Sequence, residues 1–194
     1  MIYRNATIAD IPKIEELQKR YHVASIAEEE KKHGFVTTLF TSEQLRELIE
    51  TEDGISLACD GDVIAGYAMA GSWRFWSKWP LFQHMIADLP NVEYLGQTLS
   101  TENSYQYGPV CIDMDYRGQG VLQDLFAYSA RQMNRRYRIL ITFINHVNPR
   151  SYAAHTKKVG MDVIKSFDFN GNHYYELGYD TNRAMGDKTT GNPS

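Results

Sequence analysis

The stretch that decides the fold is DYRGQGVLQD, residues 115–124. An apolar strand should pass into an amphipathic helix here, and Gly118 and Gly120 stand where that helix begins. The first N–H groups of a helix lack partners within the helix, and the helix dipole is positive at this end. Glycine lets the backbone curl without a Cβ, so several amides can point into one concavity. The turn therefore predicts an anion site, for which phosphate is the usual ligand.

Two common phosphate-binding motifs do not fit this turn. A Walker loop needs a lysine directly after its last glycine, and no lysine follows Gly120. A dinucleotide fingerprint needs a third glycine or an alanine three residues after the second glycine, where this chain has Gln123. The turn is therefore expected to hold a phosphate of another kind.

The whole chain has the composition of one soluble globular domain. It has 194 residues, of which 43% are hydrophobic and 23% charged. Cys59 and Cys111 lie far apart, so the sequence indicates neither a disulfide framework nor a zinc site, and we expect no metal. With no signal-like segment and no apolar run of about 18 residues, we expect a cytoplasmic protein that does not bind membranes.

The charge is unevenly distributed. The net charge is −4, yet residues 117–165 hold nine Lys and Arg against two Asp and Glu. A local positive field in an acidic protein favours a small polyanionic ligand over a nucleic acid. For the arginines at 131–138 a solvated helix face is the alternative.

Hydrophobic periodicity and turn residues predict an alternation of strands and helices. Strands are expected at 1–4, 55–59, 63–70, 104–114, 138–144, 161–169 and 173–178, and helices at 9–22, 41–50, 121–136 and 148–160. The strand–helix–strand unit at 104–144 implies a parallel pair with a right-handed crossover, and the hairpins beside it imply antiparallel partners. The fold class is therefore α/β (α+β), a mixed and mostly antiparallel sheet with helices on both faces. Gly108-Pro109 predicts a bulge within its strand.

The domain is expected to span residues 1–180, with a flexible tail at 181–194. Within it, residues 71–100 are rich in aromatic side chains and too long for a plain connection. This aromatic insertion is interpreted as a lid, a partner surface or a satellite core.

The glycine turn resembles the signature of the GCN5-related N-acetyltransferase (GNAT) superfamily, Arg/Gln-x-x-Gly-x-Gly/Ala. Residues 117–122 match it at Arg117 and Gly120 and depart from it at Leu122, where a small residue is usual. YRNATIADIPKIEEL, residues 3–17, looks like the first strand and helix of that family. NPRSYAAHTKKVGM, residues 148–161, resembles its fourth-helix segment, with one extra residue between His155 and Gly160. The resemblance covers about residues 1–72 and 101–179.

The resemblance implies that the cofactor is acetyl-CoA. The diphosphate would lie on the amides of the turn, and the pantetheine arm would enter between two splayed parallel strands. The implied cofactor-binding residues are Ile112, Asp113, Met114, Arg117, Gly118, Gln119, Gly120, Val121, Leu122 and Asn148. A main-chain N–H near Ile112 would polarise the thioester carbonyl.

Proton transfer needs an acid and a base. By the resemblance, His155 or Tyr152 would protonate the leaving thiolate, and Asp113 or Glu102 would serve as the base. Structural interpretations stay open beside these: Asn148 is fully explained as an N-cap, and Tyr152 and His155 as packing against the sheet.

The expected function is transfer of an acetyl group from acetyl-CoA to a primary amine of a small molecule, an amino acid or a peptide. The amine would attack directly in a ternary complex. Segments 23–40, 71–100 and 170–173 are expected to contact the acceptor. The alternative is a non-catalytic acyl-CoA-binding or regulatory module of the same fold. No nucleic acid is expected as a partner, and the chain is expected to be a monomer or a homodimer.

Overall fold

The structure is a computed structural model of the chain, and it describes residues 1–27, 29 and 35–186. A seven-stranded sheet has the order β1-β2-β3-β6-β7-β9-β8. The strands are β1 (Ile2–Asn5), β2 (Ile55–Asp60), β3 (Val63–Gly71), β6 (Ser104–Ile112), β7 (Ile139–Asn145), β8 (Asp162–Phe169) and β9 (Asn172–Asp180). Only the β6–β7 pair is parallel among these strands. The predicted mixed, mostly antiparallel sheet is confirmed.

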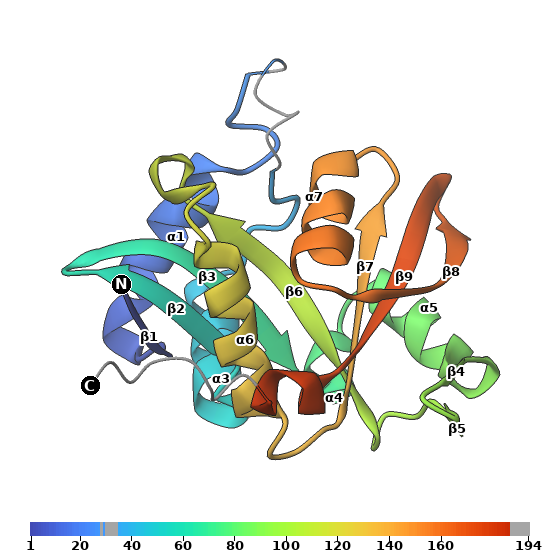
Figure 1. Cartoon of the computed structure of the whole chain (residues 1–194). Coiled ribbons are helices and arrows are strands. Elements are labelled where there is room, and N and C mark those ends of the chain that lie inside the picture. The colour runs from blue at the N-terminus through green and yellow to red at the C-terminus, as the bar shows by residue number, and fades with distance from the viewer. Residues whose placement is uncertain (28, 30–34, 187–194) are drawn as a thin grey trace.

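Helices cover both faces of the sheet (Figure 1). On one face lie α6 (Val121–Met133) and α7 (Pro149–Ala153), and on the other lie α1 (Ile11–Arg20) and α3 (Ser42–Glu52). Local sequence explains where α3 begins. The Thr41 hydroxyl accepts a hydrogen bond from the amide of Gln44, whose side chain accepts one from the amide of Thr41 in return.

The bulge predicted in β6 changes which side chains face which layer. Gly108 and Pro109 together lie opposite the single residue Met69 of β3. Before the bulge, Tyr107 packs in the core under α6, whereas Gln106 points to the opposite face. After the bulge, the even-numbered residues face α6 in place of the odd-numbered ones, and Val110 packs on the α6 side. One extra residue inverts the facing of a strand because side chains alternate with a period of two.

The parallel strands separate beyond this point. Their pairing runs from Ser104↔Ile139 to Gln106↔Ile141 and then stops. A last link is the Thr142 hydroxyl, which donates to the carbonyl of Tyr107 at 2.7 Å. Above it the ribbons of β6 and β7 diverge (Figure 1). This is the splay that the resemblance implied.

The helix after β7 contains a wide turn. Residues 149–153 are α-helical, but residues 154–158 form a π-helix, in which the amide of Val159 donates to the carbonyl of Ala154. A π turn holds one more residue than an α turn. The π turn therefore accommodates the extra residue between His155 and Gly160 without displacing the residues before and after it.

The aromatic insertion packs on the α1 and α3 face. It consists of α4 (Trp73–Trp76), α5 (Pro80–Asp88), the 3-10 turn η2 (Leu89–Asn91) and the short strands β4 (Glu93–Tyr94) and β5 (Gln97–Thr98). Trp73 is buried against Ile139 and Ile141 in a core of its own, whereas Trp76 joins the main core beside α3. The satellite-core interpretation therefore describes one part of the insertion.

The chain remains folded past residue 180. The 3-10 helix η5 (Thr181–Met185) buries Ala184 against α6, and the hydroxyl of Thr181 donates to the carbonyl of Arg138 at 2.8 Å. Residues 181–185 are therefore not part of a flexible tail, because a buried threonine and alanine anchor them. Residues 187–194 lie outside the described part. No helix within the described residues has the length and apolar character to cross a membrane.

Candidate functional site

A first cavity of about 160 Å³ lies between the start of α6 and α7. The turn before α6 has Gly118 at φ 81° and Gly120 at φ 84°, a left-handed backbone that L side chains rarely adopt. Three basic residues line the cavity, Arg117, Arg150 and Lys158, and no Asp or Glu is among its described lining residues. Unpaired helix amides and basic side chains around one concavity make an anion site.

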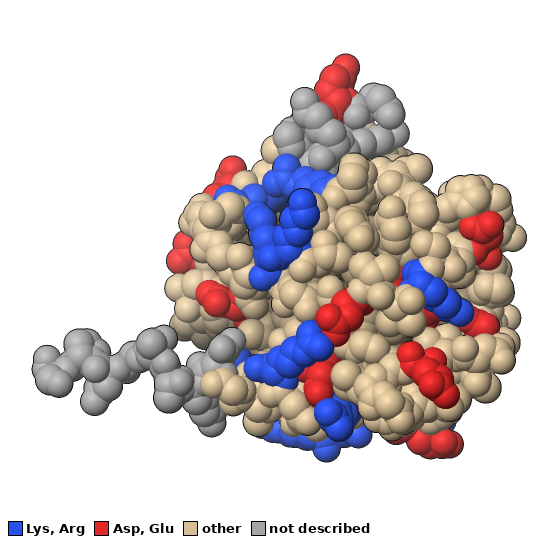
Figure 2. Space-filling model, turned by 45° about the vertical axis from the view of Figure 1, so that its right-hand side comes forward, with Lys and Arg blue, Asp and Glu red and all other residues tan. Residues whose placement is uncertain are grey.

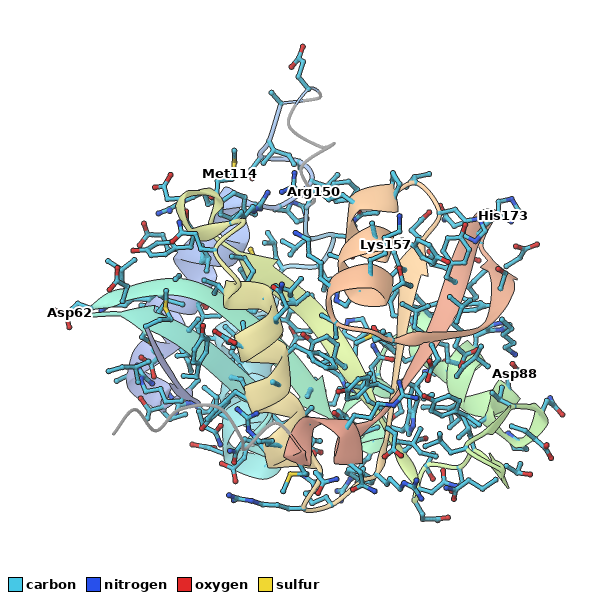
Figure 3. The ribbon with its side chains drawn as sticks, viewed as in Figure 1. Asp62, Asp88, Met114, Arg150, Lys157 and His173 are labelled. Carbon is cyan, nitrogen blue, oxygen red and sulfur yellow. The ribbon has the colours of Figure 1, made fainter. Side chains whose placement is uncertain are left out.

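The basic side chains gather on one part of the surface. Figure 2 shows a group of Lys and Arg side chains on the upper part of the face in view. Figure 3 shows Arg150 between α7 and the loop that carries Met114. Arg117 does not extend outward: its Nε donates to the carbonyl of Ile112 at 2.8 Å, and its guanidinium lies over the ring of Tyr21. Burial lowers the pKa of Arg117 from its ordinary value.

Three other basic residues of segment 117–165 are paired with carboxylates. Arg136 pairs with Glu52, Arg138 with Asp180, and Lys165 with Asp88 and Glu176. These partners come from elements far away in the sequence. Counting residues therefore overstates the positive field, because these three cations are paired with carboxylates.

Seven of the ten predicted cofactor residues line the first cavity. They are Ile112, Arg117, Gly118, Gly120, Val121, Leu122 and Asn148. The other three do not line it, and hydrogen bonds to β3, to the residue after α1 and within the loop hold them. The amide of Asp113 donates to Ala65, the amide of Met114 donates to the hydroxyl of Tyr21, and the side chain of Gln119 donates to the carbonyl of Asp115.

A second cavity of about 450 Å³ fills the splay between β6 and β7. Its floor includes Gln106 and Thr142, and its walls come from α7, the aromatic insertion and the end of the β8–β9 hairpin. The two cavities share Val110, Asn148, Ser151 and His155 in their linings. They therefore meet where the strands part.

The exposed main chain of β6 is available at this junction. The amide of Asp113 bonds to Ala65 of β3, so alternate residues, 113 and 111, direct their N–H groups toward β3. Val110 and Ile112 consequently direct theirs toward the gap. The carbonyl of Ile112 is occupied by Arg117, but Val110 lines both cavities. Sequence analysis missed Val110 because the number of residues in the bulge decides which residues after it direct their N–H groups toward the gap.

His155 occupies the junction from the α7 side. It is 5% exposed, and its Nδ1 lies 2.8 Å from the carbonyl oxygen of Ser151. A carbonyl only accepts, so Nδ1 carries the proton and the neutral ring has its lone pair at Nε2. Burial lowers the pKa of His155. These features favour a neutral imidazole that accepts a proton, which is opposite to the predicted role as an acid.

Asn148 fits both of its interpretations. Its Oδ1 accepts a hydrogen bond from the amide of Ser151 at 3.1 Å, which makes it the N-cap of α7. The same side chain lines both cavities. The Nδ2 donors are not used in the cap and can serve a ligand.

The other predicted catalytic residues lie away from the cavities. Tyr152 packs on Tyr175 with 4.3 Å between ring centroids, and it lines neither cavity. Glu102 lies in the exposed turn before β6. At about 3.3 Å per residue, eight residues place it roughly 25 Å along the chain from Val110. We give neither residue a catalytic role.

Asp113 is held in a structural network. It is 5% exposed, its Oδ2 accepts from Nη1 of Arg20 at 2.6 Å, and its Oδ1 accepts from the amide of Asp115. A carboxylate so engaged holds α1 against the loop before α6. It lines neither cavity.

Replacing Asp113 with asparagine should therefore reduce stability and leave turnover nearly unchanged. The amide keeps the cap to Asp115 but loses the ion pair with Arg20, which should lower the free energy of unfolding by about 1 kcal/mol. Urea unfolding and steady-state kinetics measure the two effects. A loss of turnover of about a hundredfold or more, the size expected for a general base, would instead restore the catalytic assignment.

Cys111 is no candidate nucleophile. It is buried beneath the first cavity, and burial raises the pKa of its thiol to about 12. A thiol in this state is nearly all protonated at neutral pH and reacts slowly.

Comparisons with known proteins support the fold. No protein-family model matches the sequence, and neither does any curated protein. Solved structures do match. Ribosomal-protein-alanine N-acetyltransferase from Brucella melitensis is 18% identical over 93% of this chain and 99% of its own, with a TM-score of 0.60. The protein yncA from Salmonella typhimurium was solved with its cofactor acetyl-CoA. It is 14% identical over 98% of this chain and 96% of its own, with a TM-score of 0.61. A GNAT-family protein from Desulfovibrio desulfuricans is 14% identical over 93% and 98%, with a TM-score of 0.60.

Proposed function

Because this chain has the fold of the GNAT-family N-acetyltransferases, we propose that it transfers an acetyl group from acetyl-CoA to a primary amine of a small molecule, an amino acid or a peptide. One observation carries the proposal: the basic cavity at the glycine turn opens into a second cavity in the splay of two parallel strands. An anion site thus joins a chamber that can hold an acceptor.

The residues present fit coenzyme A. The turn at Gly118 and Gly120 and the first amides of α6 would hold the diphosphate together with Arg150 and Lys158. The N–H group of Ile112 and the side chain of Asn148 would hold the pantetheine arm. When bound, acetyl-CoA supplies an activated thioester carbonyl.

Two groups of the chain serve acetyl transfer. The N–H of Val110 would donate to the carbonyl oxygen as that oxygen gains negative charge, an interaction worth a few kcal/mol in such sites. The Nε2 of His155 would accept the proton that the amine loses when it displaces the thiolate of coenzyme A from the acetyl group. The carbonyl of Ser151 would then stabilise the imidazolium through Nδ1–H, at 2.8 Å. No covalent enzyme intermediate is needed, which agrees with the raised pKa of the buried Cys111 thiol.

The proposal is tested by two measurements on the same protein. Thermal unfolding with coenzyme A reports binding, since a ligand of the native state raises Tm. Thiol release from acetyl-CoA across a panel of primary amines reports turnover. We expect both signals. Stabilisation without turnover of any amine would identify a non-catalytic acyl-CoA-binding module, and the absence of stabilisation would contradict both functions.

A further inference from the structure

The second cavity has aromatic walls. Nine Phe, Trp and Tyr residues are among its described lining residues, and six of them form a connected group: Phe40, Trp76, Trp79, Phe82, Phe143 and Tyr174. Their rings contact one another in a chain, with Trp79 5.6 Å from Phe40 and Phe82 5.6 Å from Phe143, measured between ring centroids. No Asp, Glu, Lys or Arg is among the described residues that line this cavity. An acceptor held there meets apolar surface and neutral polar groups.

Two of the described residues that line this cavity carry a buried polar atom without a hydrogen-bond partner, Gln106 at Oε1 and Tyr107 at its hydroxyl. Gln106 is 1% exposed, and its Oε1 makes no hydrogen bond within the described structure. Its Nε2 donates to the carbonyl of Tyr107 at 2.6 Å. A carbonyl only accepts, so this bond fixes which end of the amide is nitrogen and leaves the buried oxygen without a donor. A buried acceptor without a donor is unfavourable, so an occupant that supplies one is favoured.

We infer that the acceptor is a hydrophobic amine, bound in its neutral form, whose N–H donates to Oε1 of Gln106 while an aromatic or branched apolar group packs against Trp76 and Trp79. This inference rests on the proposed function and names the class of its acceptor. Gln106 then positions the nucleophile beside the junction where Val110 and His155 lie.

The residues that line the second cavity favour the neutral form of the amine. Moving an ammonium from water into an apolar cavity without a carboxylate disfavours the charged state, so the amine loses its proton more readily there. A free amine is also the form that attacks a carbonyl. Polyamines and lysine-rich peptides, which carry several charges, fit this lining poorly. An aromatic cage can also hold a quaternary ammonium ion, so the test compares a neutral amine with such an ion.

Binding can be measured without turnover. Trp76 and Trp79 line the cavity, so their fluorescence should change when it fills. We expect 2-phenylethylamine to bind more tightly than both ethylbenzene, which lacks the N–H donor, and (2-phenylethyl)trimethylammonium, which lacks the donor and keeps its charge. Tightest binding of the quaternary ion would overturn the inference in favour of an aromatic cation cage.

Replacing Gln106 with leucine should weaken binding of 2-phenylethylamine about tenfold and leave binding of ethylbenzene unchanged. The variant should fold, because the carbonyl of Tyr107 still accepts from Thr142; its Tm checks this. The matched control is Gln83→Leu, at an exposed position of α5 that does not line the cavity. Equal losses for both ligands, or none for the amine, would overturn the role of Gln106.

Turnover separates this inference from the proposed function. With acetyl-CoA, kcat/KM for 2-phenylethylamine should exceed that for spermidine or a lysine-rich peptide by about a hundredfold. Higher values for the polycations would overturn the inference and leave the acetyltransferase proposal standing. Binding of 2-phenylethylamine to the cavity without acetylation of any amine would support the ligand class and contradict the proposed reaction.

Discussion

Replacing Gly120 with valine is expected to weaken coenzyme A binding about a hundredfold while the fold persists. Gly120 has φ 84°, and a Cβ there would meet no atom within 4 Å, so the effect comes from backbone conformation and not from a clash. A β-branched residue strongly disfavours this region, and the turn should relax to a shape whose amides no longer converge. Losing about two charge-assisted hydrogen bonds, or about 3 kcal/mol, corresponds to that factor. Isothermal titration with coenzyme A measures it.

The matched control is Gly96→Val in the β4–β5 turn. Gly96 has φ 74° and equally open surroundings, and it lines neither cavity. It should lose a similar amount of stability and keep its affinity for coenzyme A. Equal affinity in the Gly120 variant and the parent protein would show that the turn is not the binding element.

Replacing His155 with asparagine is expected to lower kcat by roughly a hundredfold to a thousandfold, the usual contribution of general-base catalysis. The asparagine amide can still donate to the carbonyl of Ser151, so the π turn should stay intact, but no group remains at the position of Nε2. Coenzyme A affinity should change less than threefold. Steady-state kinetics with a saturating amine, together with calorimetry, separates the two effects.

The pH dependence gives an independent check of this role. Burial lowers the pKa of His155, and the groups facing its ring are Ser151 and Tyr107, whose ring centroid lies 6.2 Å away. The imidazole should therefore be neutral at pH 7 and competent as a base. Activity should fall as the pH drops through a value below the ordinary 6.5 or so of histidine, and this acid limb should vanish in the asparagine variant.

The free energy of unfolding should also decrease as the pH falls. The folded state resists protonation of His155 more than the unfolded chain does, so the unfolded state binds the extra proton first. Stability is therefore lost as the pH falls below the unfolded pKa, and the asparagine variant should lose less.

His146→Asn is the matched control for the kinetic experiment. His146 stacks on Tyr175 with 3.8 Å between centroids and lines neither cavity. Its replacement should leave kcat within about twofold of the parent. If both histidine variants lost activity equally, the loss would reflect packing of α7 and not proton transfer.

The sequence by itself determined the elements that short-range rules govern. Glycines at 118 and 120 need a left-handed backbone, Thr41 caps a helix three residues from Gln44, and Gly108-Pro109 cannot continue a regular ladder. Each of these follows from steric and hydrogen-bonding limits within a few residues. They were sufficient to predict the turn and the bulge, and hydrophobic periodicity predicted the sheet. The cofactor-binding residues that the family resemblance implies stay a prediction.

Tertiary structure decided the chemistry of the site. Asp113 pairs with Arg20, 93 residues away, and is thereby withdrawn from the cavity. The protonation of His155 depends on the carbonyl that its Nδ1 meets, and the facing of Val110 depends on how many residues the bulge contains. The oxygen of Gln106 has no donor, and the residue lines a cavity to which aromatic side chains from a distant segment contribute. Such properties depend on partners brought together by folding, since burial and long-range pairing, not local sequence, set the hydrogen bonds and charge of a side chain.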